Sequence, residues 1–378
     1  MLKAAHRHWK RALRVARAGS GILRGMLAYP LAWSGLLRPR DPLAQDVAEL
    51  LLMGFHGAGP HSFSARLLAR QVRRGQVGSV FFVHHNVGKP AKLAALLSLF
   101  GGAGAPPLLA IDHEGGSVQR LKVRHGVTIL PGAKDLCNRL SPAEAQDTYA
   151  RAGAELRRIG FNLTLGPVLD VHDPGNPAIG QFGRAYDSDV ERIAEYGKAF
   201  VAGSLQAGLV CAAKHFPGHG RAFSDSHFEP ANASATWNED ELVPFERLFA
   251  APEPPPVVMV GHLRVDGLDP SGQPATLSAP MITGLLREKL GYRGVVMTDD
   301  IDMGAISTLL PRKEAFIAAL AAGNDLVMIK NLFGYDPRVP ERAVAWVREG
   351  IARGQLSEVA IKASAARVRA LRAALGTP

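Results

Sequence analysis

Short apolar segments alternate with longer amphipathic ones along most of the chain, beginning near residue 47. The short segments are rich in Val, Ile, Leu and Phe, and they are apolar nearly throughout rather than at every second position. Strands of this kind are buried on both faces, as in a parallel sheet. The pattern therefore predicts eight strands, at 49–55, 79–83, 107–112, 162–170, 209–216, 256–262, 294–299 and 325–329.

Helical patterns separate these strands, and several carry signals for the start or end of a helix. Ser141 and Pro142 begin one helix and Gly160 ends it, while Gly208 and Gly323 end two others. Strands that alternate with helices in this way predict an α/β fold, a (β/α)8 TIM-type barrel, with an open doubly wound sheet as the alternative. The helices are expected at 64–75, 91–100, 142–160, 189–208, 238–249, 278–291 and 313–323, with a helical tail at 339–375.

Polar residues gather where six of the eight predicted strands end. One such residue can simply cap the next helix. In a barrel, however, the carboxyl ends of all strands open on the same face, where active sites lie. The sequence therefore predicts a pocket there, built from Asp112, His113, Glu114, Asp170, Lys214, His215, His262, Asp299, Asp300 and Lys330.

Positive charge is concentrated at the amino end of the chain. The first 40 residues hold nine Lys or Arg and no acid, and the total of +10 less these nine leaves +1 for the rest. A basic nucleic-acid surface on the main domain is therefore not predicted. Hydrophobic residues make up 47% of the chain, as in a soluble globular enzyme, and the only cysteines, Cys137 and Cys211, indicate no disulfide framework.

The basic residues of this segment follow a helical period, which places them opposite an apolar face. We therefore predict a basic amphipathic extension at 1–40, followed by a single catalytic domain at 41–378. The apolar stretch at 21–37 is too broken for a spanning helix or a secretory signal, which favours the cytoplasm. Peripheral contact with the inner surface of an anionic membrane, a docking helix and an unstructured extension all remain open for 1–40.

The stretch KHFPGHGRAFSDSH (214–227) allows three interpretations: a metal site, an acid–base device or a polar loop. His215 and His219 have the spacing of a helical zinc pair, but the Pro-Gly between them disfavours a helix. The metal-dependent barrel hydrolase remains an alternative on this pattern.

The acid–base interpretation depends on the end of the same stretch. Asp225 is two residues from His227, so its carboxylate can fix the imidazole tautomer and leave the other nitrogen to handle a proton. Gly218 and Gly220 would let this loop move over a substrate. His219 is expected to order the loop rather than to catalyse.

Four segments of the chain resemble glycoside hydrolase family 3, and most of all its single-domain β-N-acetylhexosaminidases. They are IDHEGGSVQRL (111–121), NLTLGPVLDV (162–171), KHFPGHGRAFSDSH (214–227) and GVVMTDDIDM (294–303), in the family's order. The resemblance implies a retaining exo-β-N-acetylglucosaminidase without metal or cofactor, acting on glycans or muropeptides that carry terminal N-acetylglucosamine, in peptidoglycan recycling. A β-glucosidase or broad-specificity β-glycosidase, phosphate in place of water as acceptor, and a sugar-binding protein remain alternatives.

The resemblance also implies roles for particular residues. Asp299 matches the family's nucleophile, which forms a covalent glycosyl-aspartate, and His227 with Asp225 matches its acid/base dyad. The implied sugar contacts are Asp112, Arg120, Arg184, Lys214 and His215.

Other positions around these motifs carry secondary expectations. His113 stands where the family often has Gln, and Ser117 where it usually has Arg, which bears on the leaving-group side of specificity. Lys214 is expected to keep Asp299 ionised. Asp300 is expected to cap a helix, with a hydrogen bond that supports the residues contacting the sugar as the alternative.

Overall fold

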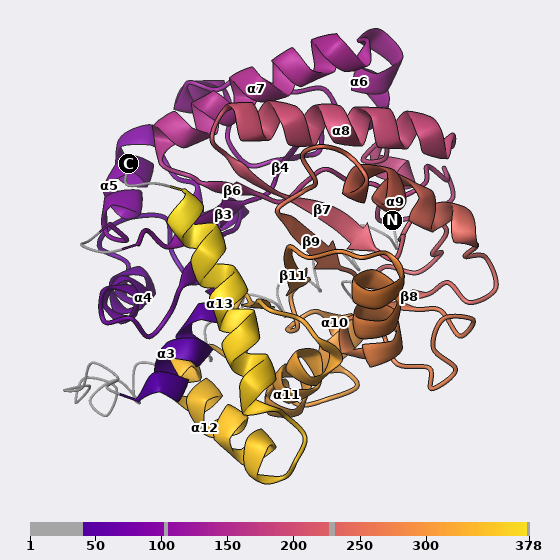
Figure 1. The fold of residues 1–378 in the computed structure, drawn as a ribbon. Coiled ribbons are helices and arrows are strands. Elements are labelled where there is room, and N and C mark those ends of the chain that lie inside the picture. Colours follow the sequence, from indigo (N-terminus) through magenta and orange to yellow (C-terminus); the bar gives the residue numbers. More distant parts are fainter. Residues whose placement is uncertain (1–40, 102–104, 227–230, 376–378) are drawn as a thin grey trace, which may run out of the picture.

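The predicted strands form a parallel barrel with helices packed around its outside (Figure 1). The computed structural model describes residues 41–101, 105–226 and 231–375. Hydrogen bonds join the barrel strands in the order β11-β9-β7-β6-β3-β2-β1-β12. The strands are β1 (Leu51–Met53), β2 (Ser79–Phe82), β3 (Leu108–Ile111), β6 (Leu163–Thr164), β7 (Val210–Phe216), β9 (Val257–Val260), β11 (Val295–Thr298) and β12 (Val327–Ile329).

The two outer strands of that order, β11 and β12, meet and complete the ring. Leu326 N donates to Val296 O at 3.1 Å, and Thr298 N donates to Leu326 O at 3.0 Å. Met297 and Leu326 form a parallel bridge at the same place. The barrel prediction is confirmed, and the open doubly wound sheet is wrong.

The predicted helices lie between the strands, with the expected signals at their ends. Ser141 Oγ accepts from Glu144 N, and Glu144 accepts from Ser141 N at 2.8 Å, which together cap the start of one helix. Gly160, Gly208 and Gly323 follow helix ends with φ values of 117°, 67° and 108°. The helices are α4 (Phe63–Arg73), α5 (Pro90–Ser98), α7 (Pro142–Ile159), α8 (Val190–Gln206), α9 (Val243–Phe249), the π-helix η6 (Pro280–Lys289), α11 (Arg312–Ala322), α12 (Val339–Ala352) and α13 (Glu358–Ala374).

Short elements that the sequence did not predict fill the connections. A segment of only a few residues is too short to show a hydrophobic period, so the sequence gives no signal for it. Three are helices: α3 (Pro42–Glu49), α6 (Ala133–Arg139) and α10 (Gly304–Ser307). Two small sheets pair β4 (His113–Gly115) with β5 (Val118–Gln119), and β8 (Ala231–Asn232) with β10 (Leu263–Arg264). The 3-10 turns are η1 (His84–Asn86), η2 (Val123–His125), η3 (Gly180–Phe182), η4 (Glu239–Leu242) and η5 (Ala275–Leu277).

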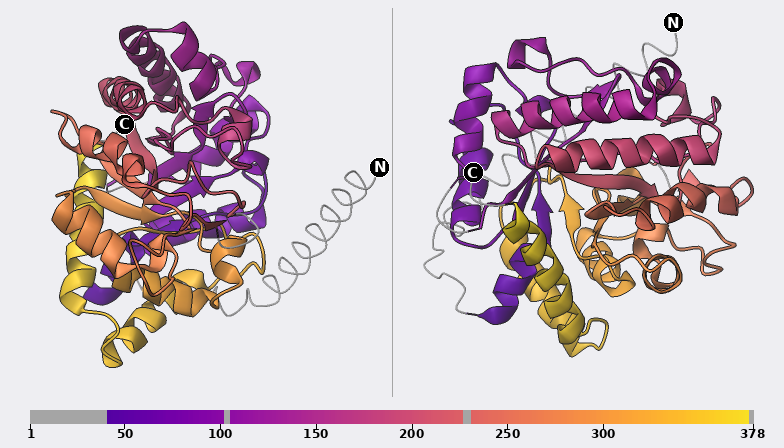
Figure 2. Two further views of the ribbon diagram at one scale, coloured as in Figure 1. Left: turned by 90° about the vertical axis from the view of Figure 1, so that its right-hand side faces the viewer. Right: turned by 45° about the horizontal axis from the view of Figure 1, so that its top comes forward.

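Both faces of the barrel strands are buried, which accounts for their uniformly apolar sequence. Leu52, Ala110 and Ala212 belong to the cluster of hydrophobic side chains that fills the barrel interior. Leu51 and Met53, which alternate with Leu52, belong instead to the layer between the strands and the helices. On one flank α7 and α8 lie side by side over the sheet (Figure 2).

Helix α13 closes the amino-terminal end of the barrel, and in Figure 1 it crosses in front of the strands. Val368 is fully buried with the interior side chains. Arg369 and Arg372 form ion pairs with Asp46 and Glu49 of α3. With this end closed, the opposite, carboxyl end is the open face of the barrel.

Two sequence predictions fall outside the described residues: the basic extension at 1–40 and His227. The division into an extension and a catalytic domain at 41–378 therefore stays a prediction. Within the described part of the chain, no helix combines the length and apolar character needed to cross a bilayer.

Candidate active site

A cavity of about 360 Å³ lies at the carboxyl ends of the barrel strands, and its size is that of an ordinary small-molecule site. The loops after β2, β3, β7, β11 and β12 all contribute side chains to its wall. Six of the predicted site residues are among them: Asp112, Arg120, Arg184, Lys214, His215 and Asp299.

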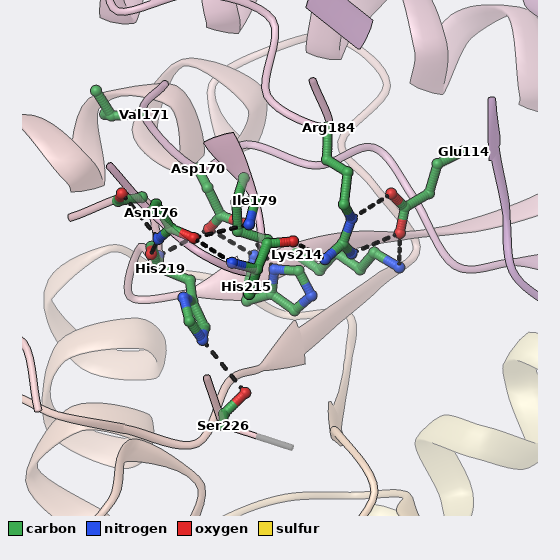
Figure 3. A network of polar contacts seen from close by, with 12 residues as sticks. Glu114, Asp170, Val171, Asn176, Ile179, Arg184, Lys214, His215, His219 and Ser226 are labelled. Atoms are coloured by element: carbon green, nitrogen blue, oxygen red, sulfur yellow. Dashed lines mark hydrogen bonds and ion pairs between the residues drawn. The ribbon is translucent and has the colours of Figure 1, made fainter. Parts of the chain in front are cut away.

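Oppositely charged side chains form a continuous chain of ion pairs at the cavity, and Figure 3 shows its Arg184–Glu114–Lys214 part. Arg184, Lys214, Asp112 and Arg120 line the cavity, whereas Glu114 is buried and pairs with two of them. Arg184 binds Glu114 through two hydrogen bonds of 2.8 Å. Lys214 Nζ lies 2.5 Å from Glu114 Oε1 and 3.4 Å from Asp112 Oδ1. Asp112 Oδ2 accepts from Arg120 at 2.9 Å. Each charge is thus fixed by a partner, and the groups facing the cavity are held ready for hydrogen bonds.

The carboxylates of this chain are ionised although they are buried. Burial alone would raise the pKa of Asp112, but Lys214 and Arg120 outweigh it and hold that pKa well below its usual range. Burial likewise opposes ionisation of Glu114, whereas Arg184 and Lys214 lower its pKa. The wall of the cavity therefore presents alternating full charges, which suit a strongly polar ligand.

Asp170, in the segment that follows β6, fixes the base of the 214–226 segment. Its Oδ2 accepts from His215 Nδ1 at 2.7 Å, and its Oδ1 accepts from the backbone N of His215 and His219 at 3.1 and 2.8 Å. Burial opposes ionisation of Asp170, but His215 and these hydrogen bonds lower its pKa to about 2. Because the ionised carboxylate is the acceptor, His215 Nδ1 carries the proton and Nε2 is left for other partners. The Lys214–His215 and Phe216–Pro217 peptide bonds are cis.

His219 orders the loop that follows. Burial lowers the pKa of His219 to about 4, so its ring is neutral at neutral pH. Its Nε2 lies 3.3 Å from Ser226 Oγ, across the loop. Asn176 Nδ2 donates to His219 O and Gly220 O at 2.7 and 2.9 Å (Figure 3). These contacts agree with the ordering role expected for His219.

Gly218 and Gly220 pack tightly against neighbouring elements, where the sequence predicted a hinge. Gly218 has a φ of 116°, and a Cβ at this position would lie 2.5 Å from Glu241. A Cβ on Gly220 would lie 2.0 Å from Val171 O. At both positions, which lie at the root of the loop, a neighbouring segment is too close for any side chain, so both residues must be glycine.

Glu241, which lies beneath this root, is fully buried. Burial, reinforced by Asp170, raises the pKa of Glu241 to about 8 although Arg221 opposes the rise. Glu241 is therefore protonated at neutral pH.

Asp299 follows β11 directly and faces the cavity. Its backbone N donates to Val260 O at 3.0 Å, and its Oδ1 accepts from Asp300 N at 2.7 Å. Burial opposes ionisation, but His262, Lys330 and His215 outweigh it and hold the pKa of Asp299 well below its usual range.

Lys330 is one of the groups that hold the pKa of Asp299 low, together with His262 and His215. Burial lowers the pKa of His262 itself. The sequence had assigned the task of keeping Asp299 ionised to Lys214, which instead binds Glu114 and Asp112. The expectation for Lys214 is therefore corrected. The neighbours of β11 in the barrel are β9 and β12, so the end of β12, and not that of β7, lies next to the end of β11.

Asp300 positions Lys330 and does not cap a helix. Its Oδ1 accepts from Lys330 N at 2.9 Å, and its Oδ2 lies 3.4 Å from Lys330 Nζ. The next helix, α10, has Met303 as its N-cap. The cap prediction is therefore wrong: Asp300 links the end of β11 to the end of β12.

The model of the glycosyl hydrolase family 3 N-terminal domain matches residues 43–371 of the chain. The chain belongs to glycoside hydrolase family 3. A β-hexosaminidase of Alkalilimnicola ehrlichii is 36% identical over 292 residues, which cover 74% of this chain and 80% of that protein. A β-hexosaminidase of Mycobacterium tuberculosis is 34% identical over 319 residues, which cover 80% of this chain and 75% of that protein.

Solved structures of the family share the barrel. A family 3 β-N-acetylglucosaminidase from Paenibacillus superposes with a TM-score of 0.79 at 34% identity, over 89% of this chain but 63% of that one. A β-N-acetylhexosaminidase from Beutenbergia cavernae has a TM-score of 0.77 at 30% identity, over 88% of this chain and 98% of that one. The chain is thus a glycoside hydrolase of family 3 whose relatives are β-hexosaminidases.

The two positions that depart from the family pattern do not line the cavity. His113 is 2% exposed, and burial lowers its pKa to about 4; it lies beside Leu130 and Tyr149, between the strands and α7. Ser117 is exposed in the β4–β5 turn, with Oγ 3.5 Å from Phe182 O. Selection of the leaving group must therefore be sought at other residues of the cavity mouth.

The histidine pair spaced like zinc ligands does not lie on a helix. His215 is in β7 and His219 is in the following loop, with ring centroids 5.7 Å apart and ring planes inclined at 66°. Over residues 41–101, 105–226 and 231–375, no group of three or more His, Cys, Asp or Glu side chains is arranged to hold a metal ion.

The structure thus brings six residues with predicted catalytic or sugar-binding roles together around the cavity. Asp225, which was also predicted, lies in the 214–226 segment next to Ser226, which lines the cavity. Glu114, Asp170 and Lys330 were recognised only as polar strand ends, yet they fix the orientation or charge of the predicted residues. Lys330 directly follows β12, and that position was a signal that could have assigned it, whereas Asp170 and Glu114 lie further from the strands that precede them.

Proposed function

We propose that this family 3 hydrolase is a retaining exo-β-N-acetylglucosaminidase that needs neither metal nor cofactor. The observation that carries the proposal is an ionised Asp299 in a cavity lined by the paired charges of Arg120, Asp112 and Lys214. The names of its relatives, β-hexosaminidase and β-N-acetylglucosaminidase, support the choice of sugar.

Asp299 is the nucleophile in this mechanism. It attacks the anomeric carbon and forms a glycosyl-aspartate, which water then hydrolyses with net retention of configuration. A nucleophilic carboxylate must be ionised, and the low pKa that Lys330 helps to maintain supports this role.

His227, oriented by Asp225, is the acid/base. It protonates the leaving oxygen in the first step and activates water in the second. Ser226, its neighbour in the chain, lines the cavity, which supports this assignment. An imidazole avoids the like-charge repulsion that a second carboxylate would experience near Asp299.

The remaining predicted residues bind the sugar ring. Asp112 is an acceptor for hydroxyl groups, while Arg120, Arg184 and Lys214 are donors. His215 adds its Nε2, because Nδ1 is bonded to Asp170. Such charged hydrogen bonds to several hydroxyls would fix the ring against Asp299.

We further propose that the natural substrates are peptidoglycan fragments with terminal N-acetylglucosamine, hydrolysed in the cytoplasm. This source rests on the family resemblance of the motifs, and both cysteines are free and buried, as suits a reducing compartment. Release of N-acetylglucosamine from purified muropeptides, with cell fractionation, tests it.

The basic extension at 1–40 would hold the enzyme at the inner surface of an anionic membrane. The face of α4 adds support, because it carries Arg66, Arg70 and Arg73 and no acidic residue. Co-sedimentation of the full chain with phosphatidylglycerol vesicles, but not with phosphatidylcholine vesicles, is the expected result. Equal recovery with both would reject membrane contact.

The function is tested by comparing the p-nitrophenyl β-glycosides of N-acetylglucosamine and glucose, with EDTA present and Asp299→Asn as control. Preference for the N-acetyl sugar, insensitive to EDTA and lost in the variant, is expected. Preference for glucose would favour the β-glucosidase alternative, loss with EDTA a metal-dependent hydrolase, and acceleration by phosphate a phosphorylase. Inactivity on both sugars would favour a sugar-binding protein.

A further inference from the structure

Two exposed side chains, Phe333 and His84, stand at the mouth of the cavity. Phe333 is 46% exposed and lines the cavity in the loop after β12, and His84 lines it in the turn after β2. Strands β12 and β2 flank β1 on its two sides, so both side chains belong to one sector of the barrel rim. Ligand pockets are lined predominantly by hydrophobic and aromatic side chains, with a few polar groups that fix orientation.

Aromatic rings fill this sector behind the two residues. His56, which follows β1, lies 5.5 Å from the ring of Tyr335 and stacks at 6.0 Å on His85. His84 and His85 are also in contact, at 5.5 Å and nearly perpendicular. His84, which lines the cavity, is therefore packed into a group of aromatic rings on this side of the rim.

The loop that carries Phe333 is held by several hydrogen bonds. Asn331 adopts a φ of 52°, and its side chain bonds both N and O of Asp336, at 3.0 and 2.9 Å. Arg312 binds Asp302 through two hydrogen bonds and also donates to Phe333 O at 3.2 Å. Because these bonds fix the backbone that carries Phe333, a ligand could bind to its side chain without the entropic cost of ordering the loop.

His84 offers an uncharged hydrogen-bonding group in the lining of the same cavity. Burial, with the nearby charges of Arg120 and Lys330, lowers the pKa of His84, so the imidazole is neutral at neutral pH. A neutral imidazole has one donor and one acceptor. The rim thus combines an apolar face with two uncharged polar atoms, unlike the charged wall deeper in the cavity.

We propose that Phe333 and His84 form the subsite for the leaving group, and that this group is a second pyranose sugar. Phe333 would stack on the apolar C–H face of that sugar, and His84 would bond one of its hydroxyls. A pyranose presents both features at once, whereas the methyl group of a methyl glycoside has no ring face to stack and no hydroxyl beyond the glycosidic oxygen. The inference rests on the proposed glycosidase function, and it assigns to this rim the selection that His113 and Ser117 cannot make from outside the cavity.

The test compares two substrates with the same cleaved sugar, N,N′-diacetylchitobiose and methyl β-N-acetylglucosaminide. Phe333→Ala should lower kcat/KM for the disaccharide by about 5- to 10-fold, mainly through KM, and leave the methyl glycoside unchanged. His84→Ala should give a smaller loss with the same selectivity, and Phe333→Trp should retain preference for the disaccharide. Val359→Ala, which removes an exposed apolar side chain on α13 at the far end of the barrel, should change neither substrate.

Equal losses on both substrates, or no loss on the disaccharide, would overturn the subsite and leave the proposed function standing. If the unaltered enzyme hydrolyses neither substrate, the proposed function fails and the subsite with it.

Discussion

Replacing Glu114 by Gln should destabilise the protein and impair sugar binding together. Glu114 binds Arg184 through two hydrogen bonds and Lys214 at 2.5 Å. The amide keeps the shape of the carboxylate but carries no charge, and at least one of its two polar atoms becomes a donor that faces a cation. Two cations whose side chains are only 12% and 3% exposed would then lose a shared counter-ion.

The size of this effect follows from the burial of the ion pairs. Removing one partner of a buried ion pair costs about 3–5 kcal/mol, because the remaining charge stays desolvated. At about 2 °C per kcal/mol for a protein of this length, the melting temperature should fall by roughly 6–10 °C. Displacement of Arg184 and Lys214 should also lower kcat/KM by at least about 100-fold, since both are proposed to bind the sugar.

The chain offers a matched control for this experiment. Glu191 and Arg247 form the same two-point contact at 2.7 to 3.1 Å, but both side chains are more than half exposed. Glu191→Gln should leave the melting temperature and kcat/KM unchanged, because water replaces the exposed pair. Thermal melts and steady-state kinetics on the three proteins measure both quantities. If Glu114→Gln behaves like Glu191→Gln, the buried ion-pair chain does not organise the site.

Three further predictions follow from the charges of the site. Lys330→Met should raise the pKa of Asp299, so the acidic limb of the kcat/KM profile should move to higher pH; an unmoved limb would refute the role of Lys330. Glu241 has a folded pKa of about 8 against an ordinary 4.5, so its contribution to stability is complete below pH 4.5 and is lost as pH rises to about 8. Glu241→Gln should therefore flatten the fall in melting temperature across that window, and an unchanged slope would count against a buried neutral Glu241. His227→Ala should slow alkyl glycosides far more than activated aryl glycosides, because only the former need proton donation; equal losses would argue against an acid role.

The fold could be read from the sequence because its signals are local. Each barrel strand is an apolar run long enough to be distinguished from its flanking helices, and residues such as Gly160 and Gly323 mark helix ends by their backbone conformation. Closure of the barrel then requires that polar residues after the strands meet on one face. Barrel closure therefore predicts that Asp112, Lys214 and Asp299 surround one cavity, as they do in the structure.

The partners within the site could not be predicted, because they depend on packing between distant segments. Glu114 and Arg184 are 70 residues apart, and nothing local links them. Lys214 was paired with Asp299 because both follow strands, but closure of the barrel brings Lys330 there instead. Phe333 lies in a short irregular loop without periodicity, so its position at the mouth appears only once Asn331 and Arg312 have fixed that loop.

The central claim, a covalent intermediate on Asp299, is tested most directly by trapping it. A 5-fluoro-β-N-acetylglucosaminyl fluoride should react and hydrolyse slowly at the second step, because fluorine disfavours the positive charge that develops in the transition state. Mass spectrometry should then find one fluorinated sugar on the peptide that contains Asp299, and none in Asp299→Asn. An adduct on another residue, or turnover of a natural β-glycoside that releases the α-anomer first, would contradict the account.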